Sequence, residues 1–191
     1  MKKIILASAS ARRKELLGKL GLKFEVAPSD YAEDVGARLA PHKLAKAISQ
    51  QKALTVASKY PNAIVIAADT FVVCRGKIMG KPRTEAEAKV MLRAISGRAH
   101  SVITGFTIVD TDEGKILSQT VETIVHVKQL SSKEIDAYVR SGEPIGKAGA
   151  YEIQGLGSVI VERIEGDYFN VVGLPLSSLA EGLEKFGVHV L

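Results

Sequence analysis

The chain has almost no cysteine and no long apolar run. Cys74 is the single cysteine among 191 residues, so no disulfide bond can form within the chain. No stretch is apolar over the roughly 20 residues that a membrane-spanning helix needs, and no secretory signal is recognisable. We therefore expect a cytoplasmic protein with no membrane partner, in which Cys74 is a small core residue.

Charge of one sign is not concentrated in any stretch. The chain has 26 lysines and arginines against 21 aspartates and glutamates, a net charge of +5, and the two signs are intermixed. A nucleic-acid-binding surface usually gathers its basic residues on one face. We therefore expect no nucleic acid as a partner, whereas a modest positive excess suits a small anionic ligand.

Several familiar catalytic patterns are also missing. The four histidines are scattered without the spacing of metal ligands, and no G-x-S-x-G nucleophile elbow occurs. The glycine-dense segment 148–157 lacks G-x-G-x-x-G, and Gly80-Lys81-Pro82 is not a complete phosphate loop. Lys81 could still act as a point charge for phosphate, or it could be an ordinary lysine in a turn.

Helical and strand patterns alternate along the chain. They predict strands at 3–8, 22–27, 99–110, 116–128, 159–164 and 168–172, and residues 63–74 form a dense apolar run broken only by Asp69 and Thr70. They predict helices at 10–21, 41–60, 84–95, 131–139 and 175–186. The two long strand patterns around residues 110–114 form a hairpin. Together they predict an α/β fold with a mixed sheet flanked by helices, in one domain of residues 1–191 with two lobes.

The first polar feature follows the apolar run at 4–7. Ser8 and Ser10 come next, and Arg12 and Arg13 then open a helical pattern. A strand that leads into a helix N-terminus directs backbone N–H groups and the positive end of the helix dipole at one point, which favours an anion such as phosphate. Ser10 is a candidate N-cap. The alternative is an ordinary first strand and helix with two solvated arginines.

Asp69 interrupts a dense apolar run. It follows Ile64-Val65-Ile66-Ala67-Ala68, at what we interpret as the carboxyl end of a buried strand. A buried carboxylate is normally paired or bound to a metal, and open α/β sheets bind ligands at the carboxyl ends of their strands. We therefore predict a functional carboxylate at Asp69. A structural ion pair is the alternative.

Taken together and in this order, these segments resemble the Maf family of nucleoside triphosphate pyrophosphatases. The matching motifs are Leu6-Ala7-Ser8-x-Ser10-x-Arg12-Arg13 with Glu15-Leu16-Leu17, Ala68-Asp69-Thr70, Gly80-Lys81-Pro82, Ser96-Gly97-Arg98-x-His100, Lys147-Ala148-Gly149-Ala150-Tyr151 with Gln154-Gly155, and Gly166-Asp167-Tyr168 with Val172-Gly173-Leu174-Pro175. No single motif is decisive, but the ordered set covers nearly the whole chain.

The resemblance implies a fold and a reaction. The fold would be similar to inosine triphosphatase, the Maf/Ham1 architecture, with two lobes around a cleft. The reaction would cleave a nucleoside triphosphate between its α and β phosphates, with a divalent cation, Mg or Mn, as cofactor and Asp69 as proton acceptor. Arg12, Thr70 and Gln154 stand where the branch associated with dTTP and UTP has them. The family is also associated with arrest of cell division.

The resemblance and the charge pattern suggest a role for each candidate residue. The phosphate-binding residues would be Ser8, Arg12, Arg13, Lys52 and Lys81, and the metal ligands would be Glu33 and Asp69. Two residues near the expected base-recognition segment depart from the family pattern. Gly146 stands where an acid often precedes the lysine, and Glu152 stands where glycine is usual.

Alternatives remain open at this point. The chain could be a non-catalytic nucleotide-binding regulator of cell division that acts through a protein partner. Asp69 could be a general base, a metal ligand, or both. A homodimer is one assembly that the sequence leaves open.

Overall fold

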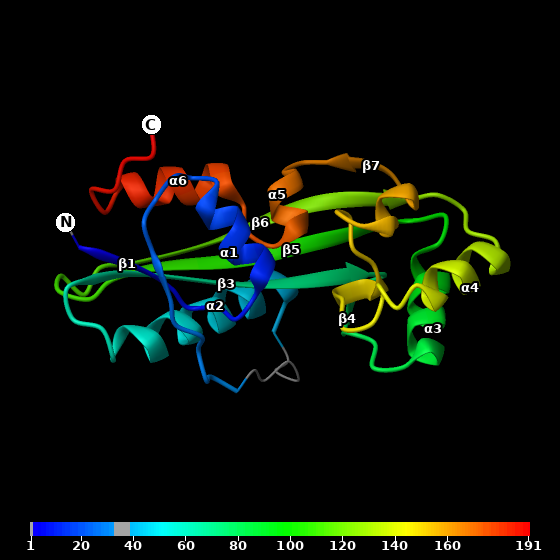
Figure 1. Ribbon diagram of the computed structural model, residues 1–191, viewed down its shortest axis with the longest axis horizontal. Helices are drawn as coiled ribbons and strands as arrows, with labels where there is room; N and C mark the ends of the chain where they lie inside the picture. Colours follow the sequence, from blue (N-terminus) through cyan, green and yellow to red (C-terminus); the bar gives the residue numbers. More distant parts are fainter. Residues whose placement is uncertain (1, 33–38) are drawn as a thin grey trace. The chain divides into compact units, whose positions relative to one another are not determined.

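A computed structural model describes residues 2–32 and 39–191 (Figure 1). Glu33, which we predicted as a metal ligand, lies outside the described residues. The elements alternate between strands and helices for most of the chain, and a hairpin of two long strands occupies its centre. This arrangement confirms the α/β class that the sequence patterns predicted.

The strands form one mixed sheet of seven strands. Its order is β2-β1-β3-β5-β6-β7, and β4 pairs with β3 off this path. β1 runs parallel to β2 and β3, whereas the pairs β3–β4 and β6–β7 are antiparallel. The strands are β1 (Lys3–Leu6), β2 (Glu25–Val26), β3 (Ala63–Cys74), β4 (Lys77–Met79), β5 (Ala99–Asp110), β6 (Ile116–Val127) and β7 (Val161–Glu165).

Several of the described helices begin at capping side chains, whereas the helices at 41–57 and 176–184 begin beside a proline without such a cap. The hydroxyls of Ser10, Thr84 and Ser131 each accept a backbone N–H in the first turn of the helix that follows. No described helix is both long and apolar enough to cross a membrane. The α-helices are α1 (Ala11–Gly18), α2 (Pro41–Ala57), α3 (Glu85–Ile95), α4 (Ser132–Arg140), α5 (Tyr168–Val172) and α6 (Leu176–Glu184), and the 3₁₀ turns are η1 (Ala148–Ala150) and η2 (Leu156–Val159).

The chain divides into two compact units. Unit 1 consists of Met1–Asp69, Thr104–Val121 and Gly173–Leu191, and unit 2 of Thr70–Ile103 and Glu122–Val172. The strands β3, β5 and β6 therefore contribute residues to both. The single domain with two lobes, as the sequence suggested it, stays a prediction.

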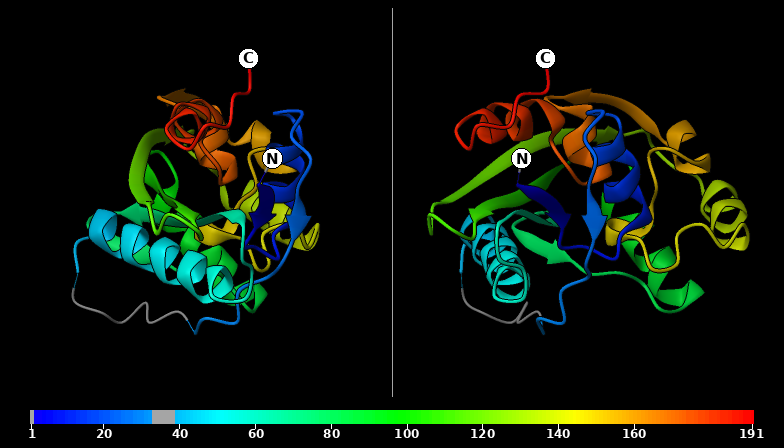
Figure 2. Two further views of the ribbon diagram at one scale, coloured as in Figure 1. Left: turned by 90° about the vertical axis from the view of Figure 1, so that its left-hand side faces the viewer. Right: turned by 60° about the vertical axis from the view of Figure 1, so that its left-hand side comes forward.

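Each unit has its own apolar core. In unit 1, α2 lies beside β1 and β3, and Ala53 and Val56 pack against Ile5 and Val65 (Figure 2). In unit 2, apolar residues of β3, β5 and β6 pack with α3 and α4. Cys74 is buried in this second core, which confirms its expected role. These cores are what hold the polar site residues in place.

The prediction of a strand at 168–172 is wrong, because this segment is helix α5. Its aromatic and β-branched residues favour a strand when read locally. However, the Asp167 carboxylate accepts N–H groups from Phe169 (2.7 Å) and Asn170 (3.3 Å), the arrangement that starts a helix. The buried Asn170 side chain also donates to the backbone oxygen of Val102 at 3.0 Å. Capping and tertiary contacts therefore override the local preference.

Several further boundaries differ from the sequence prediction; the helix expected at 10–21, for example, ends at Gly18. The strand expected at 22–27 shortens to Glu25–Val26, and β4 was not predicted. Asp69 also does not end its strand, because β3 continues to Cys74. The carboxylate thus lies within the strand, and its position cannot be explained by a strand end.

Candidate functional site

In unit 1, the end of β1 and the start of α1 bring together two serine hydroxyls, the first turn of a helix and two arginines. Ser8, which is 7% exposed, accepts the N–H of Ser10 at 3.2 Å and the Nη1 of Arg13 at 3.5 Å. Ser10 caps the helix by accepting the N–H of Arg13 at 3.4 Å. The first turn of α1 has no acidic residue. A helix N-terminus with two arginines and no acid favours an anion.

The guanidinium of Arg13 is oriented by the protein itself. Its Nε donates to the backbone oxygen of Gly173 at 2.9 Å, and its Nη1 reaches Ser8. Gly173 has a φ of 124°, a conformation that other residues rarely adopt. Residues 160 positions apart therefore meet at the start of α1, while Arg12 is half-buried in the same turn.

Lys52 and Asp69 form an ion pair in the interior of unit 1. The Nζ of Lys52 lies 2.7 Å from Oδ1 of Asp69, and the two side chains are only 12% and 9% exposed. Lys52 is on α2 and Asp69 is on β3, so the packing of this helix on this strand brings them together. Opposite charges offset part of the cost of burying each other. The structure thus joins two residues that were predicted independently.

The described residues contain no group of three or more histidines, cysteines, aspartates or glutamates arranged so that it could hold a metal ion. A site for Mg²⁺ does not require one, because this ion keeps several waters and takes one or two carboxylates together with substrate phosphates. Asp69 is a buried carboxylate of the required type. The chemistry of this donor fits the divalent cation that the resemblance to the Maf family led us to expect.

In unit 2, two segments from distant parts of the chain lie side by side. Gly149 donates its N–H to the backbone oxygen of Gly80 at 3.2 Å, and Gly146 donates to that of Pro82 at 2.9 Å. Gly149 has a φ of 70°, and a Cβ there would lie 2.9 Å from a methyl group of Val72. The turn that carries the exposed Lys81 is therefore held against the glycine-dense segment.

Gln154 and Thr70 also belong to unit 2. The Gln154 side chain is exposed, in the segment between Tyr151 and η2. Thr70 is half-buried and directly follows Asp69 along β3. The predicted residues thus fall into two groups. Unit 1 contains Asp69 and the predicted phosphate-binding residues Ser8, Arg12, Arg13 and Lys52, and unit 2 contains Thr70, Lys81 and Gln154.

Sequence reasoning missed Glu143, which anchors the segment that carries Gln154. Its carboxylate accepts the N–H groups of Leu156 (2.8 Å) and Gly157 (2.9 Å) and the hydroxyl of Tyr138 (2.7 Å). Burial alone would raise the pKa of Glu143, but the hydrogen bonds from Tyr138 and the two amides outweigh it and hold that pKa below its usual value. Nothing in the sequence separates Glu143 from an ordinary surface acid.

Comparison with known proteins identifies the family. The sequence pattern described as Maf-like protein matches residues 3–186. This chain belongs to the Maf family. A dTTP/UTP pyrophosphatase of Methanococcoides burtonii is 52% identical over 191 residues, covering 100% of this chain and 98% of that protein. A dTTP/UTP pyrophosphatase of Moorella thermoacetica is 48% identical over 190 residues, covering 100% and 98%.

A solved structure supports the Maf/Ham1 architecture. The structure of a HAM1 protein from Coxiella burnetii matches with a TM-score of 0.52 at 16% identity, covering 97% of this chain and 100% of that chain. At this identity the match concerns the fold alone. It confirms the inosine triphosphatase-like architecture that the resemblance implied.

One departure from the Maf family pattern has a structural partner. Glu152, one of the two residues that we expected to depart from the family pattern, pairs its carboxylate with Lys147 at 2.6 Å. The two side chains are 18% and 28% exposed, so solvent screens the pair only in part. The negative charge that Glu152 adds beside Gln154 is therefore offset within the same segment.

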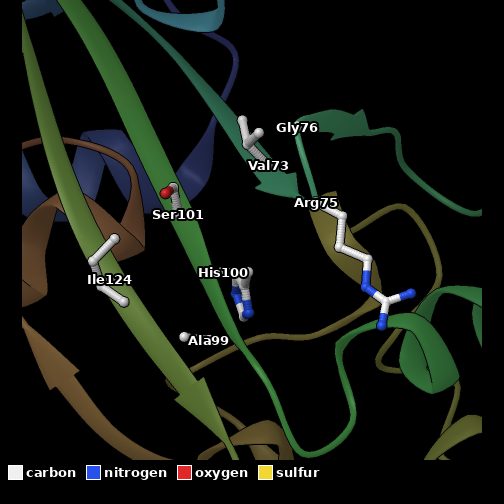
Figure 3. Close-up of a pocket in the computed structure, with 7 residues that line it drawn as sticks. All are labelled: Val73, Arg75, Gly76, Ala99, His100, Ser101 and Ile124. Atoms are coloured by element: carbon white, nitrogen blue, oxygen red, sulfur yellow. The ribbon is translucent and has the colours of Figure 1, made fainter.

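A pocket in unit 2 contains none of the predicted site residues of this Maf protein. It has a volume of about 340 Å³ and is lined by residues of β3, β5, β6 and the turn between β3 and β4 (Figure 3). The lining residues are Val73, Arg75, Gly76, Ala99, His100, Ser101 and Ile124. The pocket does not identify the site, because the charged and polar groups with predicted roles lie elsewhere.

Proposed function

We propose that this protein is a nucleoside triphosphate pyrophosphatase that hydrolyses dTTP and UTP. Water would attack the α-phosphorus, and the products would be the nucleoside monophosphate and pyrophosphate. The proposal is carried by the buried Lys52–Asp69 pair in a chain that is 52% identical over its whole length to a dTTP/UTP pyrophosphatase.

The cations of the chain would bind the triphosphate. Arg12 and Arg13 lie in the first turn of α1, where the helix dipole adds to their charge. Arg13 is oriented by Gly173 and Ser8, so less side-chain entropy is lost when it binds phosphate. Lys52 and Lys81 supply point charges for the remaining phosphate oxygens.

Asp69 would act on the attacking water. Before substrate binds, the Lys52 ammonium engages one oxygen of its carboxylate. A triphosphate offers Lys52 a second anion, and the shared ammonium then positions Asp69 relative to the phosphate. Asp69 accepts the proton of the attacking water, orients that water, or does both. A group in this position typically contributes roughly 10²–10⁴-fold to the rate.

The chain would use a divalent cation, Mg or Mn, held by Asp69 and by Glu33, which lies outside the described residues. When bound, such an ion offsets phosphate charge and lowers the pKa of its bound water. The residues of α1 and α2 would still orient the triphosphate.

Gln154 would recognise the base. Uracil and thymine present a carbonyl acceptor, an N–H donor and a second carbonyl acceptor in a row. One glutamine amide can accept from the N–H and donate to one carbonyl. The exposed position of Gln154 in unit 2 leaves its amide accessible.

The test is a measurement of pyrophosphate release by the purified protein. We expect release from UTP and dTTP at a higher kcat/KM than from the other common triphosphates, and loss of activity when EDTA removes the cation. A modified-nucleotide panel extends the comparison. Nucleotide binding with no pyrophosphate release at any metal concentration would instead favour the regulator of cell division. A cytoplasmic location and a homodimer stay predictions.

A further inference from the structure

The Glu143 carboxylate is the centre of a hydrogen-bond cluster under the segment 152–157. Three donors converge on it, the N–H groups of Leu156 and Gly157 and the hydroxyl of Tyr138. The Tyr138 hydroxyl in turn accepts the N–H of Glu152 at 3.0 Å. Backbone groups on both sides of Gln154 are thus bound to one pair of side chains.

Two glycines allow the backbone to approach this pair. A Cβ at Gly155 would collide with the Glu143 carboxylate, and one at Gly157 would lie 2.6 Å from the Tyr138 hydroxyl. A residue with a side chain at either position would displace the Glu143 carboxylate, the Tyr138 hydroxyl or the segment itself. The close contact with Glu143 and Tyr138 therefore explains why glycine occupies positions 155 and 157.

The cluster itself is held by the core of unit 2. Tyr138 lies on α4 and is 7% exposed, packed among apolar residues of β5, β6 and α3. Burial, followed by its hydrogen bond to Glu143, raises the pKa of the Tyr138 hydroxyl. The hydroxyl is therefore protonated at neutral pH, so it can donate to Glu143 and accept from Glu152 at the same time.

We propose that Glu143 and Tyr138 are positioning residues that set the position of Gln154 and thereby the preference for a uracil-type base. Neither residue touches the substrate in this proposal, which rests on the proposed function of Gln154. A mobile Gln154 would lose conformational entropy each time it binds a base, which weakens binding. An anchored backbone on both sides of Gln154 narrows the positions that its amide can take, which favours a base whose donors and acceptors match it.

The test compares Glu143→Gln with Glu134→Gln. Glutamine at 143 keeps one acceptor oxygen, and its new NH₂ group faces a backbone donor. Lost or unsatisfied hydrogen bonds of this kind correspond to about a tenfold effect. We expect KM for UTP to rise about tenfold, the UTP over CTP preference to fall by a similar factor, and kcat to change much less, because Asp69 and Lys52 lie in unit 1.

Glu134→Gln is the matched control. Glu134 also accepts a backbone N–H and a hydroxyl, both from Ser131 at 2.8 Å, and it lies in the same unit. However, its partners start helix α4 and do not belong to the segment of Gln154. We expect its KM and base preference to match those of the unaltered protein. Equal KM values and preferences in the two variants would overturn the proposal.

Tyr138→Phe covers the case in which Glu143→Gln does not fold. It removes the donor to Glu143 and the acceptor for Glu152 but keeps the ring in the core. We expect a KM effect in the same direction, and faster amide exchange at Glu152, Leu156 and Gly157. An unchanged base preference in a folded Tyr138→Phe would also contradict the proposal. If the unaltered protein released no pyrophosphate, the proposed function would fail, but the exchange measurement would still report on the anchor.

Discussion

Each unit contains a partly or fully buried carboxylate, and the two are held in different ways. In unit 1, Asp69 is paired with the ammonium at the end of a long lysine side chain. In unit 2, Glu143 accepts two backbone amides and a tyrosine hydroxyl that is itself packed in the core. A lysine ammonium can move to another anion by rotating its side chain, whereas backbone amides cannot move without the segment.

This difference separates a reactive role from a positioning role. The Lys52–Asp69 pair can rearrange when phosphate binds, so Asp69 is suited to chemistry. The Glu143 cluster loses its hydrogen bonds if the backbone at residues 156 and 157 shifts, so it is suited to holding Gln154 in place. Substitutions at Asp69 and at Gln154 would therefore affect different steps, turnover in the first case and base preference in the second.

Asp69→Asn tests the reactive side. The amide oxygen can still accept from Lys52, so we expect the melting temperature and nucleotide binding to change little. The amide cannot accept a proton at neutral pH, and we expect turnover to fall by roughly 10²–10⁴-fold. Steady-state kinetics with UTP and a thermal melt on the same preparation check this. Near-normal turnover in a folded variant would exclude Asp69 as the acting carboxylate.

Gln154→Glu tests what the anchored segment presents. A carboxylate can only accept hydrogen bonds, so it would face a pyrimidine carbonyl unfavourably but match the two N–H donors of a guanine edge. Each unsatisfied group costs about 1–3 kcal/mol, so we expect at least a tenfold shift in relative kcat/KM from UTP and dTTP toward GTP. The control is Glu162→Gln, an exposed polar change elsewhere in unit 2. A ranking identical to the unaltered protein would show that Gln154 does not read the base.

His100 extends the comparison to a buried group with a neutral partner. Its Nε2 is 2.9 Å from the hydroxyl of Tyr151, and its Nδ1 is buried without a hydrogen-bond partner in the described part of the chain. Burial, followed by repulsion from His126, lowers the pKa of His100 to about 4. The native protein therefore favours the neutral ring at neutral pH.

The unfolded chain takes up this proton near pH 6.5 and the native protein only near pH 4. The free energy of unfolding should consequently fall as pH drops from 6.5 toward 4, by up to about 1.4 kcal/mol per pH unit from this group. Denaturant titrations at pH 7 and pH 5 check this, with His100→Gln as the comparison. We expect the variant to lose less stability between the two pH values. Equal losses would show that His100 does not carry the dependence.

Much of the fold could be predicted from local sequence. Ser10, Thr84 and Ser131 marked helix starts because a capping hydroxyl acts within one turn. The apolar run at 63–74 coincides with the long strand β3, although the strand was expected to end at Asp69 and continues to Cys74. Helix α5 was mistaken for a strand, because its start depends on the Asp167 side chain and its burial on contacts with β5.

The candidate site was predictable only as separate residues. Asp69 was conspicuous because a carboxylate inside an apolar run requires a partner. That partner, Lys52, is 17 positions away and was predicted only as a phosphate-binding lysine. The role of Glu143 could not be predicted, because the three groups that donate to its carboxylate belong to residues 138, 156 and 157 and converge only in the folded chain.

The sequence by itself determined the α/β class, most helix starts and the ordered motifs of the Maf family, since these depend on periodicity, capping and residue identity over short distances. Tertiary structure alone decided which charges meet. Whether Lys52 reaches Asp69, whether Gly173 orients Arg13, and whether Glu143 holds the segment of Gln154 all depend on residues brought within about 3 Å by packing. No local pattern encodes a distance between residues that are far apart in the chain.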